Sequence, residues 1–375
     1  MALVKAFFTQ PNAANTHLDL LLQLVATSQN NSQIHGFISH LDDDGGNEQD
    51  EPIVRPFLDE LVNAAKRGVK VRFIVRNYYM EEAQYLQEQS RGLIDVKTGR
   101  GCYGSRIHTK LFLFSQATLG AEELKNIVVA GSATMSASSI RKHQNTVLVS
   151  DGKFYNGAVD YWKECYKRTS DKPGKPNDCR VAFATKDKLV NALCHPYIDR
   201  VKYHDPLYSL IKGLGPQIIG GKRPLIRVAM ARWHKSERED IVSAIQDRLA
   251  NGGCALEVVY RHDPRYDVGI SKAMEDQLKQ WKKNIKYGEY VSLYKSKVGD
   301  NKSDVHSKYL ILRGYHESDK SDPKTWKSIV RTGSPNWTEA GQYSNDEISV
   351  TIDDKKVSKK FNDNFEEMKS VCEKI

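Results

Sequence analysis

The segments Ile107-His108-Thr109-Lys110-Leu111-Phe112-Leu113-Phe114 and Val305-His306-Ser307-Lys308-Tyr309-Leu310-Ile311-Leu312 are near-copies of each other. Each places a His and a Lys two residues apart at the start of an apolar run. Such a run predicts a buried β-strand, in which side chains two residues apart point to the same face. The two copies therefore predict one anion-binding site that is lined by two imidazoles and two ammonium groups.

The sequence around the two motifs also repeats, which indicates an internal duplication. In the first half, strand-like runs near 33–40 and 69–75 enclose a helical pattern at 53–65; in the second half, runs at 225–230 and 255–260 enclose one at 241–249. Strands that alternate with helices predict an α/β fold with a mixed, largely parallel sheet flanked by helices in each half. The predicted lobes span 1–168 and 186–375, joined by a linker at 169–185 that begins with residues rich in Pro, Gly and charge.

The composition is that of a soluble globular protein, with 39% hydrophobic and 27% charged residues among 375. The net charge of +9 favours anionic partners. The apolar runs are too short to cross a bilayer, so no transmembrane segment is expected. The six cysteines show neither a CxxC pair nor zinc spacing, and no metal site is predicted. A secreted protein whose signal peptide has been removed is slightly favoured over a cytoplasmic one.

A second strand follows each His-x-Lys strand and ends in Gly-Ser, at Ala130-Gly131-Ser132-Ala133-Thr134 and at Thr332-Gly333-Ser334-Pro335-Asn336. A phosphodiester repels nucleophiles by its negative charge, so a site must neutralise its oxygens and hold the phosphorus in line. Lysines supply the charge, and Ser and Asn side chains supply hydrogen-bond donors. One neutral imidazole can attack phosphorus while the other transfers protons, and this scheme needs no cofactor.

This pattern resembles the phospholipase D superfamily over essentially the whole chain. The resemblance implies two pseudo-symmetric α/β lobes, with the active site at their interface, and a two-step reaction through a covalent phosphohistidine. It implies that His108 is the nucleophile and His306 the general acid and base, while Lys110 and Lys308 grip the phosphate. The predicted phosphate-binding residues beside them are Ser132, Thr134, Ser334 and Asn336.

The motifs depart from the family pattern at two kinds of position. The family motif closes with an Asp four variable residues after the Lys, where this chain has Ser115 and Arg313. That Asp is usually structural, so its loss weakens the motif without removing the chemistry. In the first half, Thr134 occupies the place of the expected Asn and can still donate a hydrogen bond.

An acidic residue often follows the Gly-Ser turn and orients a histidine in this family. Glu347 fits in the second half, 13 positions after Ser334 (347 minus 334), and the same count from Ser132 reaches Asn145, a further predicted substrate-binding residue. An amide cannot carry the charge that stabilises an imidazolium, so the two halves are electrostatically unequal. If Glu347 serves His306, the favoured nucleophile becomes His306, and this alternative stays open.

The resemblance indicates the reaction class more firmly than the substrate. The pattern is similar to that of bacterial phospholipase-D-like proteins, which favours a monomeric enzyme that cleaves or transfers the headgroup of a phospholipid at a membrane surface. Five aromatic residues are candidates for lipid contact, with burial in the core as the alternative: Tyr78, Tyr79, Tyr103, Trp233 and Trp337. The positive charge supports a nuclease that cuts DNA or RNA as a second interpretation. A degenerate phosphate-binding relative is the third.

Overall fold

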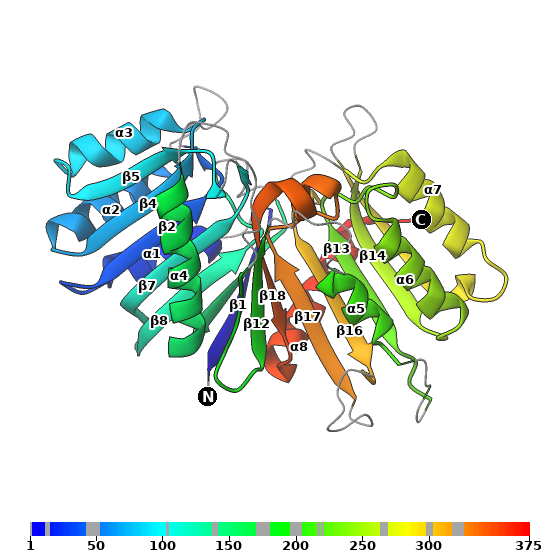
Figure 1. Ribbon diagram of the computed structural model, residues 1–375. Coiled ribbons are helices and arrows are strands. Elements are labelled where there is room, and N and C mark those ends of the chain that lie inside the picture. The colour runs from blue at the N-terminus through cyan, green and yellow to red at the C-terminus, as the bar shows by residue number, and fades with distance from the viewer. Residues whose placement is uncertain are drawn as a thin grey trace. The chain divides into compact units, whose positions relative to one another are not determined.

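The structure is a computed structural model in which the chain forms two compact α/β units (Figure 1). It describes residues 2–11, 16–42, 53–102, 105–136, 142–169, 181–195, 205–215, 218, 221–262, 269–297, 303–316 and 326–375. The first unit comprises Met1–Ile198, Gly333–Pro335 and Gly341–Val350, and the second comprises Asp199–Thr332, Asn336–Ala340 and Thr351–Ile375. Each unit contains mixed strands flanked by helices, which confirms the predicted fold class.

The first unit is built on a seven-stranded sheet with the order β1-β10-β8-β7-β2-β4-β5. Its strands are β1 (Leu3–Thr9), β2 (Gln33–Ile38), β4 (Lys70–Arg76), β5 (Ile94–Gly99), β7 (Lys110–Leu119), β8 (Glu122–Gly131) and β10 (Gln144–Ser150). β2, β4 and β5 pair in parallel, whereas β7 is antiparallel to both β2 and β8. The sheet is less parallel than predicted because β7 and β8 are joined by a two-residue hairpin loop, in which Gly120 adopts a φ of 63°.

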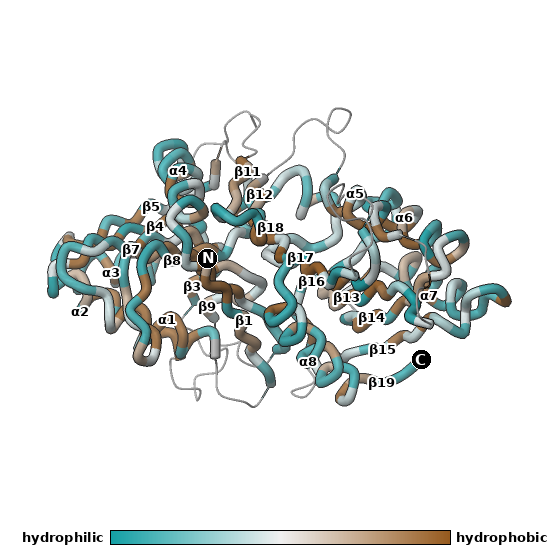
Figure 2. Tube along the Cα trace, turned by 90° about the horizontal axis from the view of Figure 1, so that it is seen from below, coloured by the Kyte–Doolittle hydropathy of each residue, from teal (hydrophilic) through white to brown (hydrophobic). Residues whose placement is uncertain are grey.

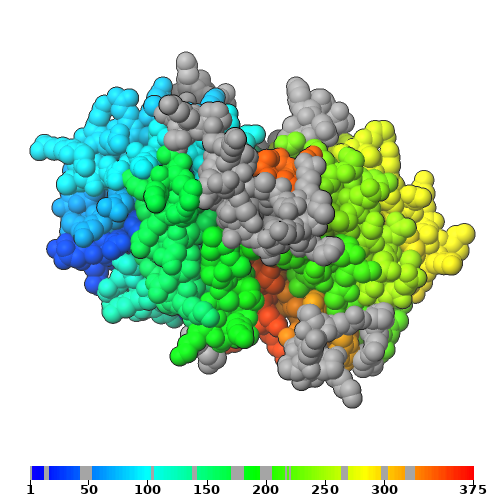
Figure 3. Space-filling model, viewed as in Figure 1, coloured from blue at the N-terminus to red at the C-terminus, as the bar shows by residue number. Residues whose placement is uncertain are grey.

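The sheet of the first unit is covered on both faces because the side chains of β2 alternate between them. Ile34 and Ile38 lie in a core shared with three helices, whereas the His35 ring stacks on Trp162 of a fourth helix at a centroid distance of 4.1 Å. The three helices are α1 (Thr16–Ala26), α2 (Arg55–Lys66) and α3 (Met80–Gln89), and the fourth is α4 (Gly152–Arg168). In Figure 3, α4 forms part of the green surface on the viewed side of this unit.

The second unit repeats this arrangement around a sheet with the order β17-β16-β13-β14-β15-β19. Its strands are β13 (Leu225–Met230), β14 (Ala255–His262), β15 (Val291–Lys297), β16 (Lys308–Gly314), β17 (Lys327–Gly333) and β19 (Glu373–Lys374). Its helices are α5 (Pro206–Lys212), α6 (Glu239–Ala250), α7 (Lys272–Lys282), α8 (Lys355–Val371) and the 3-10 turn η3 (Gly288–Tyr290). Leu310 and Leu312 of β16 share a core with α5, α6 and α7, while Tyr309 packs edge to face on Phe361 of α8. Figure 2 shows the resulting pattern, with β13 and β14 largely brown and the outer side of α7 teal.

The predicted repeat is confirmed by the position of the two His-x-Lys strands. β7 lies between β2 and β8, and β16 lies between β13 and β17, each antiparallel to both neighbours. In each unit the strand next to the His-x-Lys strand continues into a parallel trio, β2-β4-β5 or β13-β14-β15. The duplication seen in the sequence is therefore a duplication of topology.

Part of the predicted linker belongs to the first unit. Residues 170–180 lie outside the described residues, but β11 (Val181–Ala184) pairs with β12 (Val190–His195), and Phe183 packs on Phe154 of α4. The lobe boundaries at 169–185 therefore stay a prediction. The remaining short elements are β3 (Leu41–Asp42), β6 (Arg106–Ile107), β9 (Met135–Ser136), the π-helical turn η4 (Ala340–Ser344) and β18 (Asn345–Ile352).

Replacing Phe112, two residues after Lys110 on β7, should destabilise the first unit strongly. Its side chain is 1% exposed and packs edge to face on Phe57 and Phe73. Phe112→Ala should lower the free energy of unfolding by about 3–5 kcal/mol, because it leaves a cavity in a packed core. Urea unfolding measures this, with Leu93→Ala as the control, since Leu93 is 57% exposed and its loss should cost less than about 0.5 kcal/mol. An equal effect of the two substitutions would contradict this core.

Candidate active site

Backbone hydrogen bonds on either side of His108 hold the imidazole at the entrance to β7. The His108 amide donates to the Asp346 carbonyl at 3.1 Å, and the Thr109 carbonyl accepts from the Ser39 amide at 3.0 Å. The predicted continuous strand from Ile107 is therefore interrupted: β6 pairs with β18, and β7 begins only at Lys110. This break places His108 in a loop instead of in the sheet.

The imidazole of His108 is bound by a buried carboxylate that comes from the other sequence repeat. His108 Nδ1 lies 2.6 Å from Glu347 Oε1, and the Glu347 side chain is fully buried. The hydroxyl of Ser334 donates to Glu347 Oε2, and Asn345 Nδ2 donates to Oε1 at 3.2 Å. All four residues belong to the first unit. In this structure the carboxylate binds His108, whereas the alternative had it serve His306.

The charge of Glu347 is maintained by its cationic neighbours. Burial alone would raise the pKa of this carboxyl, but the His108 imidazolium, its hydrogen bond and the nearby Lys110 together lower the pKa to about 2. The carboxylate is therefore ionised at neutral pH. With Nδ1 engaged by Glu347, Nε2 is the ring nitrogen of His108 that can react with a phosphate.

Lys110 lies beside this pair and is itself buried. Its Nζ donates to the His108 carbonyl at 2.6 Å, and its side chain is among the buried polar groups of the unit. Burial lowers the pKa of Lys110 to about 8, with Glu347 opposing the shift and Arg106 adding to it. The ammonium group is thus charged at pH 7 but loses its proton just above the physiological range.

The second motif repeats the local geometry of the first. Lys308 Nζ donates to the His306 carbonyl at 2.8 Å and lies 3.2 Å from His306 Nδ1. The Ser307 carbonyl accepts from the Ala231 amide at 3.1 Å, as the Thr109 carbonyl does from Ser39. Each motif therefore folds its lysine back onto its own histidine carbonyl.

The Gly-Ser turns correct one predicted equivalence. The Ser334 amide donates to the Ile348 carbonyl at 2.9 Å, and the Ser132 amide donates to the Asn145 carbonyl at the same distance. In the backbone pairing, Asn145 thus corresponds to Ile348, and the position that corresponds to Glu347 is Gln144. The predicted match of Asn145 with Glu347 is wrong by one residue, because counting along the chain cannot detect a shift of one in the strand register.

The structure leaves the phosphate-binding roles of the remaining predicted residues as proposals. Thr134 Oγ1 lies 3.3 Å from Ser136 Oγ in the first unit. In the second unit, the buried Oδ1 of Asn336 has no hydrogen-bond partner among the described residues, so it is available to a ligand. Of the aromatic candidates, Trp233 and Trp337 are core residues, Tyr79 is buried, Tyr78 is 78% exposed, and Tyr103 lies outside the described residues.

Asp346 positions the loop before His108, a role that the sequence did not predict. Its Oδ2 accepts from the Cys102 amide at 2.9 Å and from the Ser105 hydroxyl at 2.5 Å. Burial raises the pKa of Asp346 well above its usual value, against the hydrogen bond from Ser105. A Cβ at Gly101 would lie 1.5 Å from Asp346 Oδ2, so only glycine leaves room for this contact. In the sequence, the position of Asp346 directly before Glu347 is the feature that could have indicated this role.

Further cationic groups surround Lys110 in the first unit. Burial lowers the pKa of His40 to about 2, and the charges of Lys110, His108, Arg76 and Arg106 add to the shift. Arg76 also has a lowered pKa, from burial and then from Arg106. His40 is therefore neutral, and Arg76 and Arg106 lie close enough to interact electrostatically with it. Among the described residues, no group of three or more His, Cys, Asp or Glu side chains could hold a metal ion.

The fold is similar to those of several solved phosphate-chemistry enzymes. Phosphatidylserine synthase from Haemophilus influenzae Rd KW20 is 10% identical, with a TM-score of 0.66, and the match covers 100% of this chain and 89% of that one. Polyphosphate kinase from Porphyromonas gingivalis is 14% identical with a TM-score of 0.59, covering 97% of this chain but only 50% of the kinase. Yeast tyrosyl-DNA phosphodiesterase is 9% identical with a TM-score of 0.51, covering 93% and 89%.

Family membership follows from the sequence match. No curated protein matches the chain. A family model described as "Cardiolipin synthase, PLD-like domain" matches residues 47–166 and 222–369, which include both His-x-Lys motifs and well over half of the chain. The chain belongs to the PLD-like domain family, within the phospholipase D superfamily.

Proposed function

We propose that this protein cleaves a phosphodiester of a glycerophospholipid through a covalent phosphohistidine at His108. The observation that carries the proposal is the 2.6 Å contact between His108 Nδ1 and the buried carboxylate of Glu347. It holds one tautomer of the imidazole and leaves Nε2 for attack, as a nucleophile oriented by a carboxylate requires.

In the first step, the lone pair of His108 Nε2 forms a bond to phosphorus while the bond from phosphorus to the leaving oxygen breaks. The ring then carries a positive charge, which the Glu347 carboxylate stabilises. Lys110 neutralises a non-bridging oxygen. In the proposal, His306 gives its proton to the leaving alcohol, and Lys308 supports the same phosphate.

In the second step, His306 accepts a proton from water, whose oxygen bonds to phosphorus as the bond to His108 breaks. An alcohol in place of water gives transfer of the headgroup instead of hydrolysis. Both steps balance without a redox partner. In this proposal Ser132, Thr134, Ser334 and Asn336 bind substrate, as the resemblance suggests. Asn145 is left out, because the spacing that matched it with Glu347 is wrong by one residue.

The lipid substrate is supported by the description of the family model, which names cardiolipin synthase. The similar fold of a phosphatidylserine synthase is consistent with it. No helix among the described residues is long and apolar enough to cross a membrane, so the proposed encounter with lipid is peripheral. Arg76 and Arg106 repel a cationic headgroup, so they favour an anionic lipid such as phosphatidylglycerol over zwitterionic phosphatidylcholine. The same cations and the net charge of +9 favour a nuclease as the second candidate.

The experiment that separates the candidates is a parallel assay on vesicles of phosphatidylcholine, vesicles of phosphatidylglycerol, single-stranded DNA and double-stranded DNA. The proposal predicts release of headgroup from lipid, with phosphatidylglycerol preferred, and none from the His108→Ala protein. Cleavage of DNA alone would replace the lipid proposal with the nuclease. No turnover on any diester would indicate a degenerate relative.

Removing the charge of Glu347 should affect turnover far more than the same change in its neighbour. Glu347→Gln should lower kcat by roughly 100-fold or more, because the imidazolium loses its counter-charge. Asp346→Asn should retain activity within about threefold, because burial already favours a neutral carboxyl there. Steady-state kinetics with a soluble diester measures both, and thermal unfolding controls for folding. Equal losses in both variants would contradict a catalytic role for the charge.

The rate should depend on pH through Lys110. Its pKa of about 8 lies below the ordinary value of 10.5, so the charged form that binds phosphate is lost as pH rises through about 8. The value of kcat/KM for a soluble diester should therefore fall above that pH. Lys110→Arg keeps its charge to much higher pH and should shift this fall upward. An unchanged alkaline limb in the arginine variant would rule out Lys110 as its cause.

A further inference from the structure

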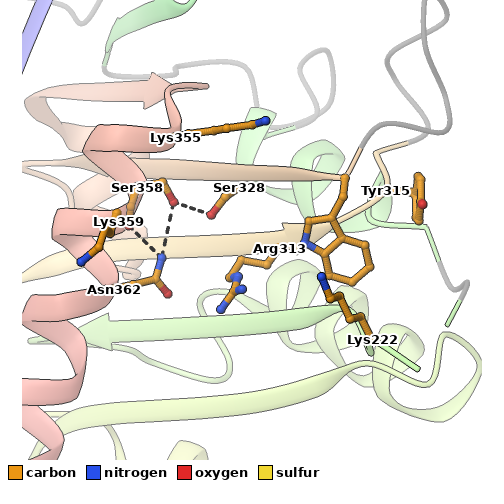
Figure 4. A pocket seen from close by; sticks show the side chains of 9 residues that line it. Lys222, Arg313, Tyr315, Ser328, Lys355, Ser358, Lys359 and Asn362 are labelled. Carbon is orange, nitrogen blue, oxygen red and sulfur yellow. Dashed lines mark hydrogen bonds between the residues drawn. The ribbon is translucent and has the colours of Figure 1, made fainter. Parts of the chain in front are cut away.

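Arg313 has no part in the chemistry above, although it occupies the place where the family motif has an Asp. It lies near the end of β16, five residues after Lys308 and thus about 17 Å along the strand. There it lines a cavity of about 710 Å³ in the second unit, which Figure 4 shows between α8 and Lys222. This volume suits a small organic ligand.

The cavity is strongly basic. Lys222, Arg313, Lys355 and Lys359 line it, and none of its nine described lining residues is acidic. Lys359 forms an ion pair with Asp363 at 2.7 Å, on the exposed side of α8. Lys222, Arg313 and Lys355 form no ion pair with any residue that the structure describes. Three cations with no counter-charge among the described residues make this cavity attractive to an anion.

The polar floor of the cavity is fixed in place. Lys355, Ser358, Lys359 and Asn362 occupy one face of α8, at positions i, i+3, i+4 and i+7. Asn362 Nδ2 donates to the Ser358 carbonyl at 2.7 Å, and Ser358 exchanges a short hydrogen bond with Ser328 of β17 (Figure 4). Asn362 Oδ1 also accepts from Arg227 at 2.8 Å, so the floor is rigid and the cations above it are the groups left to contact a ligand.

Two aromatic side chains complete the lining. Tyr315 and Trp326 pack edge to face, with ring centroids 5.6 Å apart, and both are only partly buried. Partly exposed rings beside cations suit the organic portion of a phosphate ester, since the ring faces contact apolar or planar groups while the cations hold the phosphate. Simple inorganic anions would leave these rings unused.

We propose that this cavity is a second ligand site that binds an anionic organic phosphate, with its phosphate oxygens at Lys222, Arg313 and Lys355 and its organic part against Tyr315 and Trp326. A soluble nucleotide and the headgroup of an anionic phospholipid share this chemistry. The site is separate from His306 and Lys308, which lie at the opposite end of β16, and it does not depend on the proposed reaction.

The test uses calorimetric titration of the full-length protein with ATP at low salt, and sedimentation with vesicles of phosphatidylcholine with and without phosphatidylglycerol. The double variant Arg313→Gln/Lys355→Gln should weaken binding at least about tenfold, because two charge-assisted contacts are lost. Lys110→Met should retain binding, which excludes the catalytic site as its origin. Trp326→Ala should weaken binding of ATP more than binding of inorganic triphosphate.

The matched control is Lys356→Gln/Lys360→Gln, which removes the same charge from exposed positions of α8 that do not line the cavity. This control should bind within about twofold of the unmodified protein, and thermal unfolding should show that all variants are folded. Binding of ATP in solution assigns a soluble ligand, and recruitment by phosphatidylglycerol alone assigns a headgroup. Equal losses in the two double variants, or no binding of either probe, would overturn the proposal.

Discussion

The site depends on one buried hydrogen bond, between the carboxylate of Glu347 and Nδ1 of the His108 imidazole. A carboxylate with no exposed surface is costly unless cations and donors surround it, and here His108, Lys110 and Ser334 do so. The pair also joins segments 239 residues apart in the chain, because Glu347 and Ser334 come from the second sequence repeat and His108 from the first. The fold of the first unit is thus incomplete without residues from the C-terminal part of the chain.

Much of the architecture could be predicted from the sequence, because it rests on local patterns. The helix predicted at 53–65 appears as α2, and the strand predicted at 255–260 appears as β14, since apolar periodicity marks each of them. The break between Ile107 and Lys110 could not be predicted, because it arises from hydrogen bonds to Ser39 and to Asp346, which are remote in sequence. The sequence also could not predict which histidine Glu347 binds, because the spacing from the Gly-Ser turn does not show which residues lie next to the strand in space.

The two repeats share backbone geometry but differ in the side chains that use it. Where β18 presents Glu347 to a histidine, β10 presents Gln144, and an amide provides no charge. The second repeat differs again at Arg313, where a position that closes the motif in the family instead contributes to a basic cavity. The two copies therefore share a topology but differ in their charges. The ionised carboxylate of Glu347 lies beside the histidine of the first motif.

The most direct test of this account is to identify the residue that carries the covalent phosphate. The protein would be quenched with alkali during turnover of a labelled phosphodiester, digested and mapped by mass spectrometry. The account predicts phosphate on Nε2 of His108, less of it in Glu347→Gln and none in His108→Ala. Phosphate on His306 in the unmodified protein, or no phosphate on either histidine during active turnover, would contradict it.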